Sequence, residues 1–135
     1  MLRKTFASPG AVSIGPYSHA VESGPVVYLS GQTPVDPGTG SLVSGDIAAQ
    51  TQQCLDNLFQ VLSAAGLVPD DVVKVNVFLA DMGDYSRMNA VYSRNFGTPY
   101  PARTTIGVAG LPLGARVEIE MIARRGPVIP AGAGE

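Results

Sequence analysis

The sequence predicts an α+β fold, in which a mixed six-stranded sheet carries two helices on one face. Two segments place apolar residues at helical spacing, and the strand-like segments around them are short and lie between Gly- and Pro-containing turns. The order along the chain is β-β-β-α-β-α-β-β, and helices distributed in this way are expected to pack on one side of the sheet. The opposite face has no cover within one chain, so we expect it to contact another subunit.

Three strands are expected before the first helix. They span residues 2–6, 18–22 and 26–31, and the last of them is a strongly apolar segment, VVYLSG. The segment TPVDPGTG, residues 33–40, contains two prolines and is expected to be a loop.

The first helix is expected to run from Ile47 to Ala65. Asp46 is suited to cap its N-terminus, and Gly66 is suited to end it. Cys54 lies within this helix and is expected to pack as a small apolar group. The apolar positions that recur at helical spacing are Ile47, Cys54, Leu55, Leu58, Leu62 and Ala65.

The second half of the chain predicts a strand, a helix and two further strands. Residues 72–80, VVKVNVFLA, are rich in β-branched side chains, and Asp84 is expected to cap the helix that follows. The final strands are expected near 102–108 and 116–124. The apolar stripe of this second helix consists of Tyr85, Met88, Tyr92 and Phe96.

Length and composition favour a single domain that associates with copies of itself. The 135 residues predict one domain over residues 1–126, followed by a loosely ordered tail over residues 127–135. Only 15% of the residues are charged and 45% are hydrophobic, which suggests that other copies of the chain cover part of the surface. A lightly charged monomer is the alternative.

Charge and residue counts argue against several classes of function. The net charge is −2 and the basic residues are scattered, so no nucleic-acid partner is expected. One cysteine and one histidine provide neither an intrachain disulfide nor a cluster of metal ligands, so no metal is expected. No apolar run approaches the ~20 residues that span a bilayer, and the N-terminus does not resemble a signal peptide. We therefore expect a cytoplasmic protein without a membrane partner.

Charged side chains occur in two C-terminal segments that otherwise resemble core. Because side chains alternate across a strand, Arg103 shares a face with Thr105, and Glu118 shares one with Glu120 and Arg116. The simplest interpretation of Arg116, Glu118 and Glu120 is a solvated polar face. The planar fork of Arg103 suits a carboxylate or a phosphate, and an internal ion pair with one of the glutamates is the alternative.

Other polar residues are candidates for the same site. Tyr17 follows a Gly-Pro turn, and Ser30-Gly31 ends an apolar strand, where backbone N–H groups can remain free to donate to a ligand. His19 could act as a base, although a lone histidine in a turn is expected to be solvated. Asn89 lies off the apolar stripe of the second helix, and it either faces solvent or reaches a cleft.

Five segments resemble, in order, those of the RidA/YjgF family, over residues 14–124. The most specific part is PAR, followed by a short apolar stretch, a Leu-Pro loop and an apolar-Glu-Ile sequence. The segments are IGPYSHAV, VYLSGQTPVDPGTG, QTQQCLDNLFQVLSAAGL, VVKVNVFLADMGDYSRMNAVYSRNF and PARTTIGVAGLPLGARVEIEMIA.

The resemblance implies a chorismate-mutase-like fold and a homotrimer with three clefts between neighbouring subunits. It also implies hydrolysis of reactive 2-enamine and 2-imino acids to a 2-oxo acid and ammonia, without a cofactor or a metal. The expected ligand is therefore a small imino acid or another small carboxylate.

The resemblance assigns roles to particular residues. It places the substrate-carboxylate arginine at Arg103 and the water-positioning glutamate at Glu118. Thr105 stands where many deaminases of the family have cysteine, and its backbone is expected to help to hold the water, whereas the replacement leaves substrate choice open. The remaining expected binding residues are Tyr17, Ser30, Gly31 and Asn89.

The resulting hypothesis is geometric: Arg103 and Glu118 should converge on one crevice where protomers meet. Three alternatives remain open. The chain could be an RNA-cleaving inhibitor of translation, a non-catalytic module that binds small carboxylates, or a deaminase with a different substrate. We expect Arg103 nearby to lower the pKa of Glu118 and burial to raise it, and the sequence does not decide between the two effects.

Overall fold

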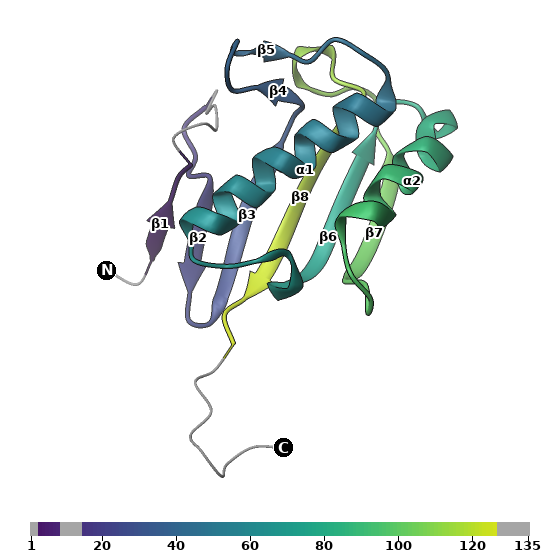
Figure 1. The fold of residues 1–135 in the computed structure, drawn as a ribbon. Coiled ribbons are helices and arrows are strands. Elements are labelled where there is room, and N and C mark those ends of the chain that lie inside the picture. Colours follow the sequence, from purple (N-terminus) through teal and green to yellow (C-terminus); the bar gives the residue numbers. More distant parts are fainter. Residues whose placement is uncertain (1–2, 9–14, 127–135) are drawn as a thin grey trace.

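A computed structural model describes residues 3–8 and 15–126, and these residues form a mixed sheet with two helices (Figure 1). The strand order is β1-β2-β3-β8-β6-β7, in which only the β6–β7 pair is parallel. A second, two-stranded sheet pairs β4 with β5. The strands are β1 (Lys4–Phe6), β2 (Ala20–Ser23), β3 (Val26–Gln32), β4 (Val35–Asp36), β5 (Ser41–Leu42), β6 (Val72–Leu79), β7 (Ala102–Gly107) and β8 (Val117–Arg124).

Both helices cover the same face of the six-stranded sheet, as predicted (Figure 1). Helix α1 (Ile47–Ala64) begins after Asp46, whose side chain accepts a hydrogen bond from the N–H of Ala49. Gly66 follows the helix with a φ of 76°, a left-handed conformation that glycine adopts without strain. Helix α2 (Tyr85–Asn95) lies beside α1, over β6 and β7.

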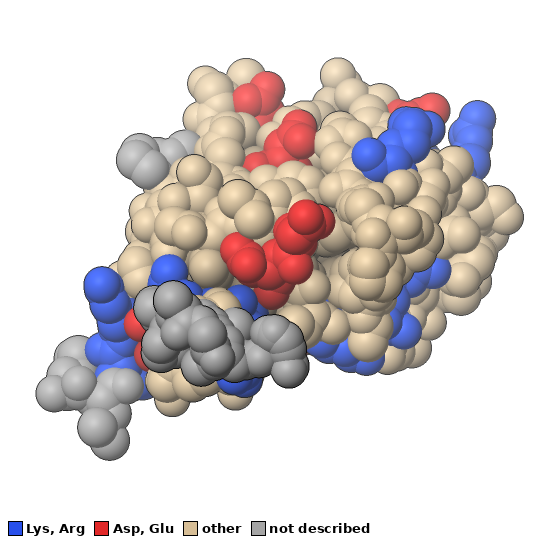
Figure 2. Space-filling view, turned by 60° about the horizontal axis from the view of Figure 1, so that its bottom comes forward, with Lys and Arg blue, Asp and Glu red and all other residues tan. Residues whose placement is uncertain are grey.

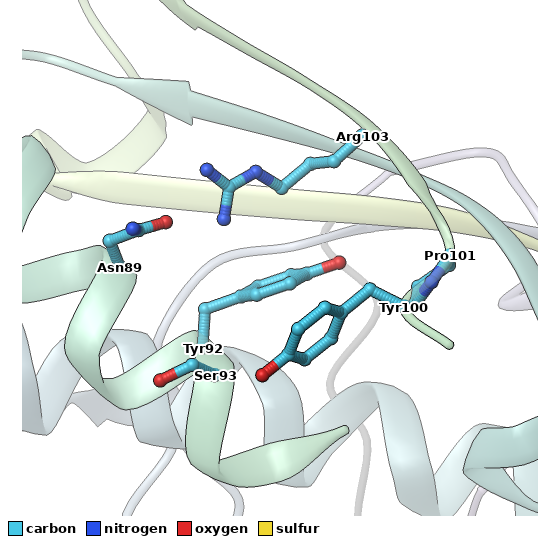
Figure 3. A pocket seen from close by; sticks show the side chains of 6 residues that line it. All are labelled: Asn89, Tyr92, Ser93, Tyr100, Pro101 and Arg103. Carbon is cyan, nitrogen blue, oxygen red and sulfur yellow. The ribbon is translucent and has the colours of Figure 1, made fainter. Parts of the chain in front are cut away.

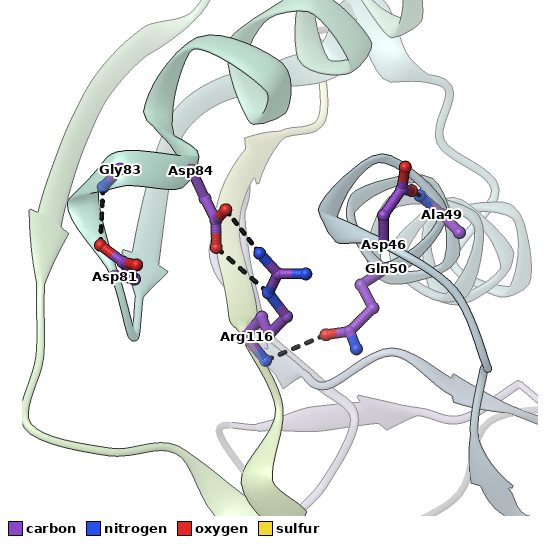
Figure 4. A network of polar contacts seen from close by, with 7 residues as sticks. All are labelled: Asp46, Ala49, Gln50, Asp81, Gly83, Asp84 and Arg116. Atoms are coloured by element: carbon purple, nitrogen blue, oxygen red, sulfur yellow. Dashed lines mark hydrogen bonds and ion pairs between the residues drawn. The ribbon is translucent and has the colours of Figure 1, made fainter.

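The start of α2 differs from the prediction. Asp84 precedes the helix but makes no capping bond; its carboxylate instead accepts from Nε and Nη2 of Arg116, at 3.2 and 2.6 Å (Figure 4). The backbone N–H of Arg116 donates to Gln50 on α1, at 2.9 Å. A nearly buried carboxylate is better satisfied by a guanidinium than by a single backbone donor, so Asp84 pairs with Arg116. The Arg116 side chain is 43% exposed, so the prediction of a solvated residue holds in part, but its ion pair with Asp84 was not predicted.

The hydrophobic core lies between the sheet and the two helices. On β6, Val75, Val77 and Leu79 are fully buried, whereas the intervening Asn76 and Phe78 are half-buried on the other face. The Cys54 thiol is fully buried in α1, as predicted. The largest fully buried side chains are Ile47, Leu55, Leu58, Leu62, Leu79, Met88, Ile119 and Met121.

His19 is buried and not solvated, contrary to the prediction. The Ser30 N–H donates to the His19 carbonyl at 2.9 Å, which extends the pairing of β2 with β3 by one residue and holds His19 against the sheet. Its side chain is 6% exposed, and neither ring nitrogen has a hydrogen-bond partner among the described residues.

Two other predictions concern the segment of residues 33–40 and the C-terminal tail. The segment predicted as a loop, residues 33–40, contributes one strand to a short hairpin, because β4 pairs with β5 in the register Val35–Leu42. The predicted tail, residues 127–135, lies outside the described residues, as does residue 2 of the first predicted strand.

The sheet face opposite the helices is uncovered in the single chain. It carries large side chains that remain about half exposed, such as Tyr28 on β3 and Ile106 on β7, at 50% and 45%. The fold of the single chain therefore provides no cover for this sheet face. Within the described ranges, no helix is long and apolar enough to cross a bilayer.

Candidate functional site

Arg103 lies on the edge strand β7 and projects toward the helices. It pairs with Val75 of β6, and paired residues in neighbouring strands share a face. Its guanidinium carbon lies 4.6 Å from the ring centroid of Tyr92 and 5.7 Å from that of Tyr85. One of its N–H groups, on Nη2, donates to the Tyr85 hydroxyl at 3.1 Å. Two aromatic side chains of α2 thus hold the guanidinium in place.

No acidic side chain neutralises Arg103 in the described part of the chain. The ion pairs found there join Arg116 to Asp84 and Arg125 to Glu22, so the alternative of an internal pair with Glu118 or Glu120 was wrong. Arg103 instead borders a pocket of about 390 Å³, the Arg103 pocket, in which its guanidinium extends over Tyr92 toward Asn89 (Figure 3). The pocket is lined by Asn89, Tyr92, Ser93, Tyr100, Pro101 and Arg103.

Glu118 projects from the opposite face of the same sheet. It pairs with Phe78 of β6, which faces away from the buried side chains of Val77 and Leu79. Its carboxylate borders a second pocket of about 370 Å³, the Glu118 pocket. The residues that line it are Tyr17, Ser30, Gly31, Thr33, Pro112, Glu118 and Glu120.

Ser30 and Gly31 form an irregularity in β3 that shapes the Glu118 pocket. The β3–β8 register shifts between the pairs Leu29–Met121 and Gln32–Ile119, so Ser30 and Gly31 together lie opposite a single residue. The Ser30 hydroxyl donates to the Ser18 carbonyl at 2.6 Å. Because the Ser30 N–H also bonds to a carbonyl within the chain, it is not free for a ligand, and that part of the prediction was wrong.

Gly31 lies in direct contact with Glu118, and this leads to a prediction. A methyl group at position 31 would overlap Oε2 of Glu118, so Gly31→Ala should displace the carboxylate while the backbone keeps its conformation. We expect a loss of up to about 10²-fold in kcat/KM, since a shift of about 1 Å can cost that much. Gly110→Ala is the control, because a methyl group there meets nothing within 4 Å. Equal activity of the two variants would contradict the placement of Glu118 in the site.

Burial raises the pKa of Glu118, and the negative charge of Glu120 raises it further. Within one chain Arg103 does not oppose this shift, because it lies on the other face of the sheet. The Glu120 carboxylate accepts from Asn76 Nδ2 at 3.0 Å, which fixes it beside Glu118.

The direction of this shift predicts a pH dependence. A carboxylate that accepts a proton must be ionised, so activity should fall at acid pH as Glu118 becomes protonated, and Glu120 beside it should shift this acidic limb to higher pH. Glu120→Gln removes the like charge and keeps an oxygen for Asn76, so the acidic limb of the kcat/KM profile should move to lower pH. A limb that stays in place would show that the titrating group is not Glu118.

Thr105 lies on the same side of β7 as Arg103, as predicted, because it pairs with the core residue Val77. Its hydroxyl is buried and has no hydrogen-bond partner among the described residues. Within one chain β6 lies between β7, which carries Thr105, and β8, which carries Glu118, so the two residues are not on neighbouring strands.

Apart from Thr105, which lines neither, the predicted site residues are thus gathered into two pockets of the single chain. Arg103 and Asn89 share one pocket, whereas Tyr17, Ser30-Gly31 and Glu118 share the other. Sequence reasoning missed the contacts of Tyr85 and Tyr92 with Arg103, since both appeared only as members of an apolar stripe. Their spacing could have indicated a shared contact, because Tyr85 and Tyr92 are seven residues apart and therefore lie on the same side of the helix. Among the described residues no group of three or more His, Cys, Asp or Glu side chains could hold a metal ion.

Comparison with known proteins agrees with the resemblance found in the sequence. The profile of the family described as Endoribonuclease L-PSP matches residues 8–125. The chain belongs to the RidA/YjgF family. This RidA/YjgF chain is 45% identical, over 127 residues, to human 2-iminobutanoate/2-iminopropanoate deaminase, and the match covers 94% of this chain and 91% of the human protein. A RutC family protein of Pyrococcus horikoshii is 48% identical over 110 residues, or 82% and 87% of the two chains.

Solved RidA/YjgF structures have the same fold. The crystal structure of the Escherichia coli yjgF gene product superimposes with a TM-score of 0.85 at 42% identity, covering 91% of this chain and 99% of that one. RidA from an Antarctic Psychrobacter species gives a TM-score of 0.86 at 43% identity, over 90% and 98% of the chains. The α+β architecture, with two helices on a six-stranded mixed sheet, is therefore that of the family.

Proposed function

We propose that this protein hydrolyses reactive 2-imino acids, of the 2-iminopropanoate and 2-iminobutanoate type, to the 2-oxo acid and ammonia. One observation carries the proposal: Arg103 presents a positioned guanidinium to a pocket and has no carboxylate partner among the described residues. A small ligand with a carboxylate would supply the missing partner. The names of the mammalian relatives, which are imino acid deaminases, support the same substrate class.

The proposed reaction needs only these side chains and a water molecule. Arg103 binds the substrate carboxylate with two parallel hydrogen bonds and so fixes the imine carbon. Glu118 takes a proton from water as the water oxygen attacks that carbon. Glu118 passes this proton to the nitrogen, which gives a tetrahedral carbinolamine. As the C–N bond breaks, the hydroxyl proton of the carbinolamine moves through Glu118 to the nitrogen, which leaves the 2-oxo acid and ammonia. The backbone of Thr105 is proposed to help to hold the water.

The complete site is proposed to form between subunits of a homotrimer. In one chain Arg103 and Glu118 face opposite sides of the sheet, so a shared site requires Arg103 of one subunit and Glu118 of its neighbour. The uncovered sheet face, with Tyr28 and Ile106 half exposed, is a surface that such an assembly would bury. Asn89 would then contribute from the first subunit, and Tyr17 from the second.

The direct test is to generate 2-iminobutanoate in situ and to follow its loss with and without the protein. We expect faster conversion to 2-oxobutanoate and ammonia than in buffer alone. Binding of 2-oxobutanoate without any acceleration would instead support the non-catalytic carboxylate-binding alternative. A third outcome, turnover of other imino acids only, would support a deaminase with a different substrate.

Cleavage of RNA is the second candidate, because the description of the family profile names an endoribonuclease. In Figure 2 the basic side chains lie in separate groups on the face shown, with acidic side chains between them. With the net charge of −2, this arrangement offers little to an RNA backbone. Ribonuclease activity that persists through repurification and is lost in Glu118→Gln would favour this candidate.

A further inference from the structure

The immediate surroundings of Arg103 have two distinct parts. The ring of Tyr92 covers one face of the guanidinium, at 4.6 Å, and a buried tyrosine ring provides a fixed apolar support there. Burial also raises the pKa of Tyr92 to about 12, so its phenol stays neutral and forms no ion pair with Arg103. The Tyr92 ring therefore limits how closely the guanidinium approaches helix α2. A flat ring face does not, however, fix the rotation of the guanidinium within its own plane.

The Tyr85 hydroxyl supplies the missing restriction. It accepts a hydrogen bond from Nη2 of Arg103, at 3.1 Å, and so defines the rotation of the guanidinium within its own plane. A ring contact and a directional hydrogen bond together restrict the orientation of the guanidinium. The remaining N–H groups of Arg103 have no side-chain acceptor among the described residues.

The position of Tyr85 is itself fixed by the fold. Tyr85 is the first residue of α2 and directly follows Asp84, whose carboxylate is held by two hydrogen bonds from Arg116. Arg116 is in turn bonded to Gln50 of α1 through its backbone N–H (Figure 4). The backbone from which Tyr85 projects is thus linked, through Asp84 and Arg116, to α1 and to the residue before β8.

We propose that Tyr85 is a positioning residue, which holds the Arg103 guanidinium in the orientation that receives a substrate carboxylate; this rests on the proposed function. An arginine side chain is costly to order, and an Arg103 that is ordered before binding loses less entropy when a carboxylate arrives. Tyr85 acts through Arg103 and does not itself touch the substrate.

Two variants of Tyr85 separate the hydrogen bond from the ring. Tyr85→Phe keeps the ring beside Arg103 and removes the acceptor, so Kd for 2-oxobutanoate should weaken by about three- to ten-fold, the effect of one hydrogen bond. Tyr85→Leu removes both contacts and should weaken binding further. Ser86→Ala, at an exposed position one residue along α2, is the matched control and should bind like the wild type.

A second measurement reports the orientation of Arg103 without any ligand. In protein labelled with ¹⁵N-arginine, restricted rotation should give separate Nη resonances for Arg103, which are assigned by their loss in Arg103→Lys. These resonances should broaden or merge in Tyr85→Phe and stay separate in Ser86→Ala. A merely structural role for Tyr85 would change the melting temperature and leave the spectrum of a folded variant unaltered.

The outcomes distinguish the inference from the function on which it rests. If Arg103→Ala keeps wild-type turnover, the proposed function fails. If Arg103→Ala is inactive but Tyr85→Phe matches the wild type in Kd and in the Nη resonances, only the role of Tyr85 is overturned. Weaker binding together with merged resonances in Tyr85→Phe, and neither change in Ser86→Ala, supports the inference.

Discussion

Replacing Arg103 with alanine is expected to reduce kcat/KM for 2-iminobutanoate by about 10²- to 10³-fold, the cost of removing one partner of a hydrogen-bonded charge pair. The substrate carboxylate would lose both its binding energy and its orientation relative to the attacking water. The measurement is the rate of 2-oxobutanoate formation from imine generated in situ. The fold should survive, because Arg103 makes no ion pair with another described residue.

Two further variants define what Arg103 contributes. Arg103→Lys keeps the charge, but an ammonium cannot stack on Tyr92 and form two parallel hydrogen bonds at once, so most of the activity should still be lost. Arg94→Ala removes an exposed arginine from the last turn of α2 and should leave the rate unchanged. A fully active, folded Arg103→Ala protein would place the reaction elsewhere on the molecule.

Mixing two inactive variants is expected to restore activity. Arg103→Ala and Glu118→Ala alter different pockets, so in the proposed homotrimer a mixed assembly can still form a site from an intact Arg103 of one subunit and an intact Glu118 of the next. Random assembly of equal amounts should recover about one quarter of the wild-type rate, since each site needs two intact contributions. The variants are co-refolded from denaturant, and the rate is compared with that of each variant refolded alone.

The control for this experiment uses two lesions in one pocket. Arg103 and Asn89 both line the Arg103 pocket of the same chain. In a mixture of Arg103→Ala and Asn89→Ala every Arg103 pocket therefore carries one of the two substitutions, and no combination of subunits restores an intact site. The rate of this mixture should be the average of the two separate preparations. Absence of recovery in the Arg103→Ala and Glu118→Ala mixture, with trimers present, would contradict a site shared between subunits.

Local sequence patterns predicted the helices and strands well, because the start, spacing and end of such an element depend on residues close to it in the sequence. The helix after Asp46 follows from a cap, an apolar period and a terminal glycine, and all three are found in the structure. The face shared by Arg103 and Thr105 follows from strand alternation alone. Which side of the sheet this face occupies depends on the pairing of Arg103 with Val75, a register that distant packing decides and local pattern does not.

Polar side chains were predicted less well, because their partners are distant in sequence. Asp84 is a good capping residue by its position, but Arg116 lies 32 residues away and offers a stronger partner. His19 looked exposed in a turn, yet the pairing of β2 with β3 buries it. Tyr85 and Tyr92 fitted an apolar stripe, and only the three-dimensional structure shows that they also contact a cation.

The opposed directions of Arg103 and Glu118 have a consequence for how the protein would be controlled. If each catalytic centre is split between chains, an isolated chain is inert, and specific activity becomes a function of how much protein a cell makes. Dilution below the assembly constant would switch the enzyme off without any inhibitor. A modest change in expression near that threshold would then change the total deaminase activity by a larger factor than the amount of protein.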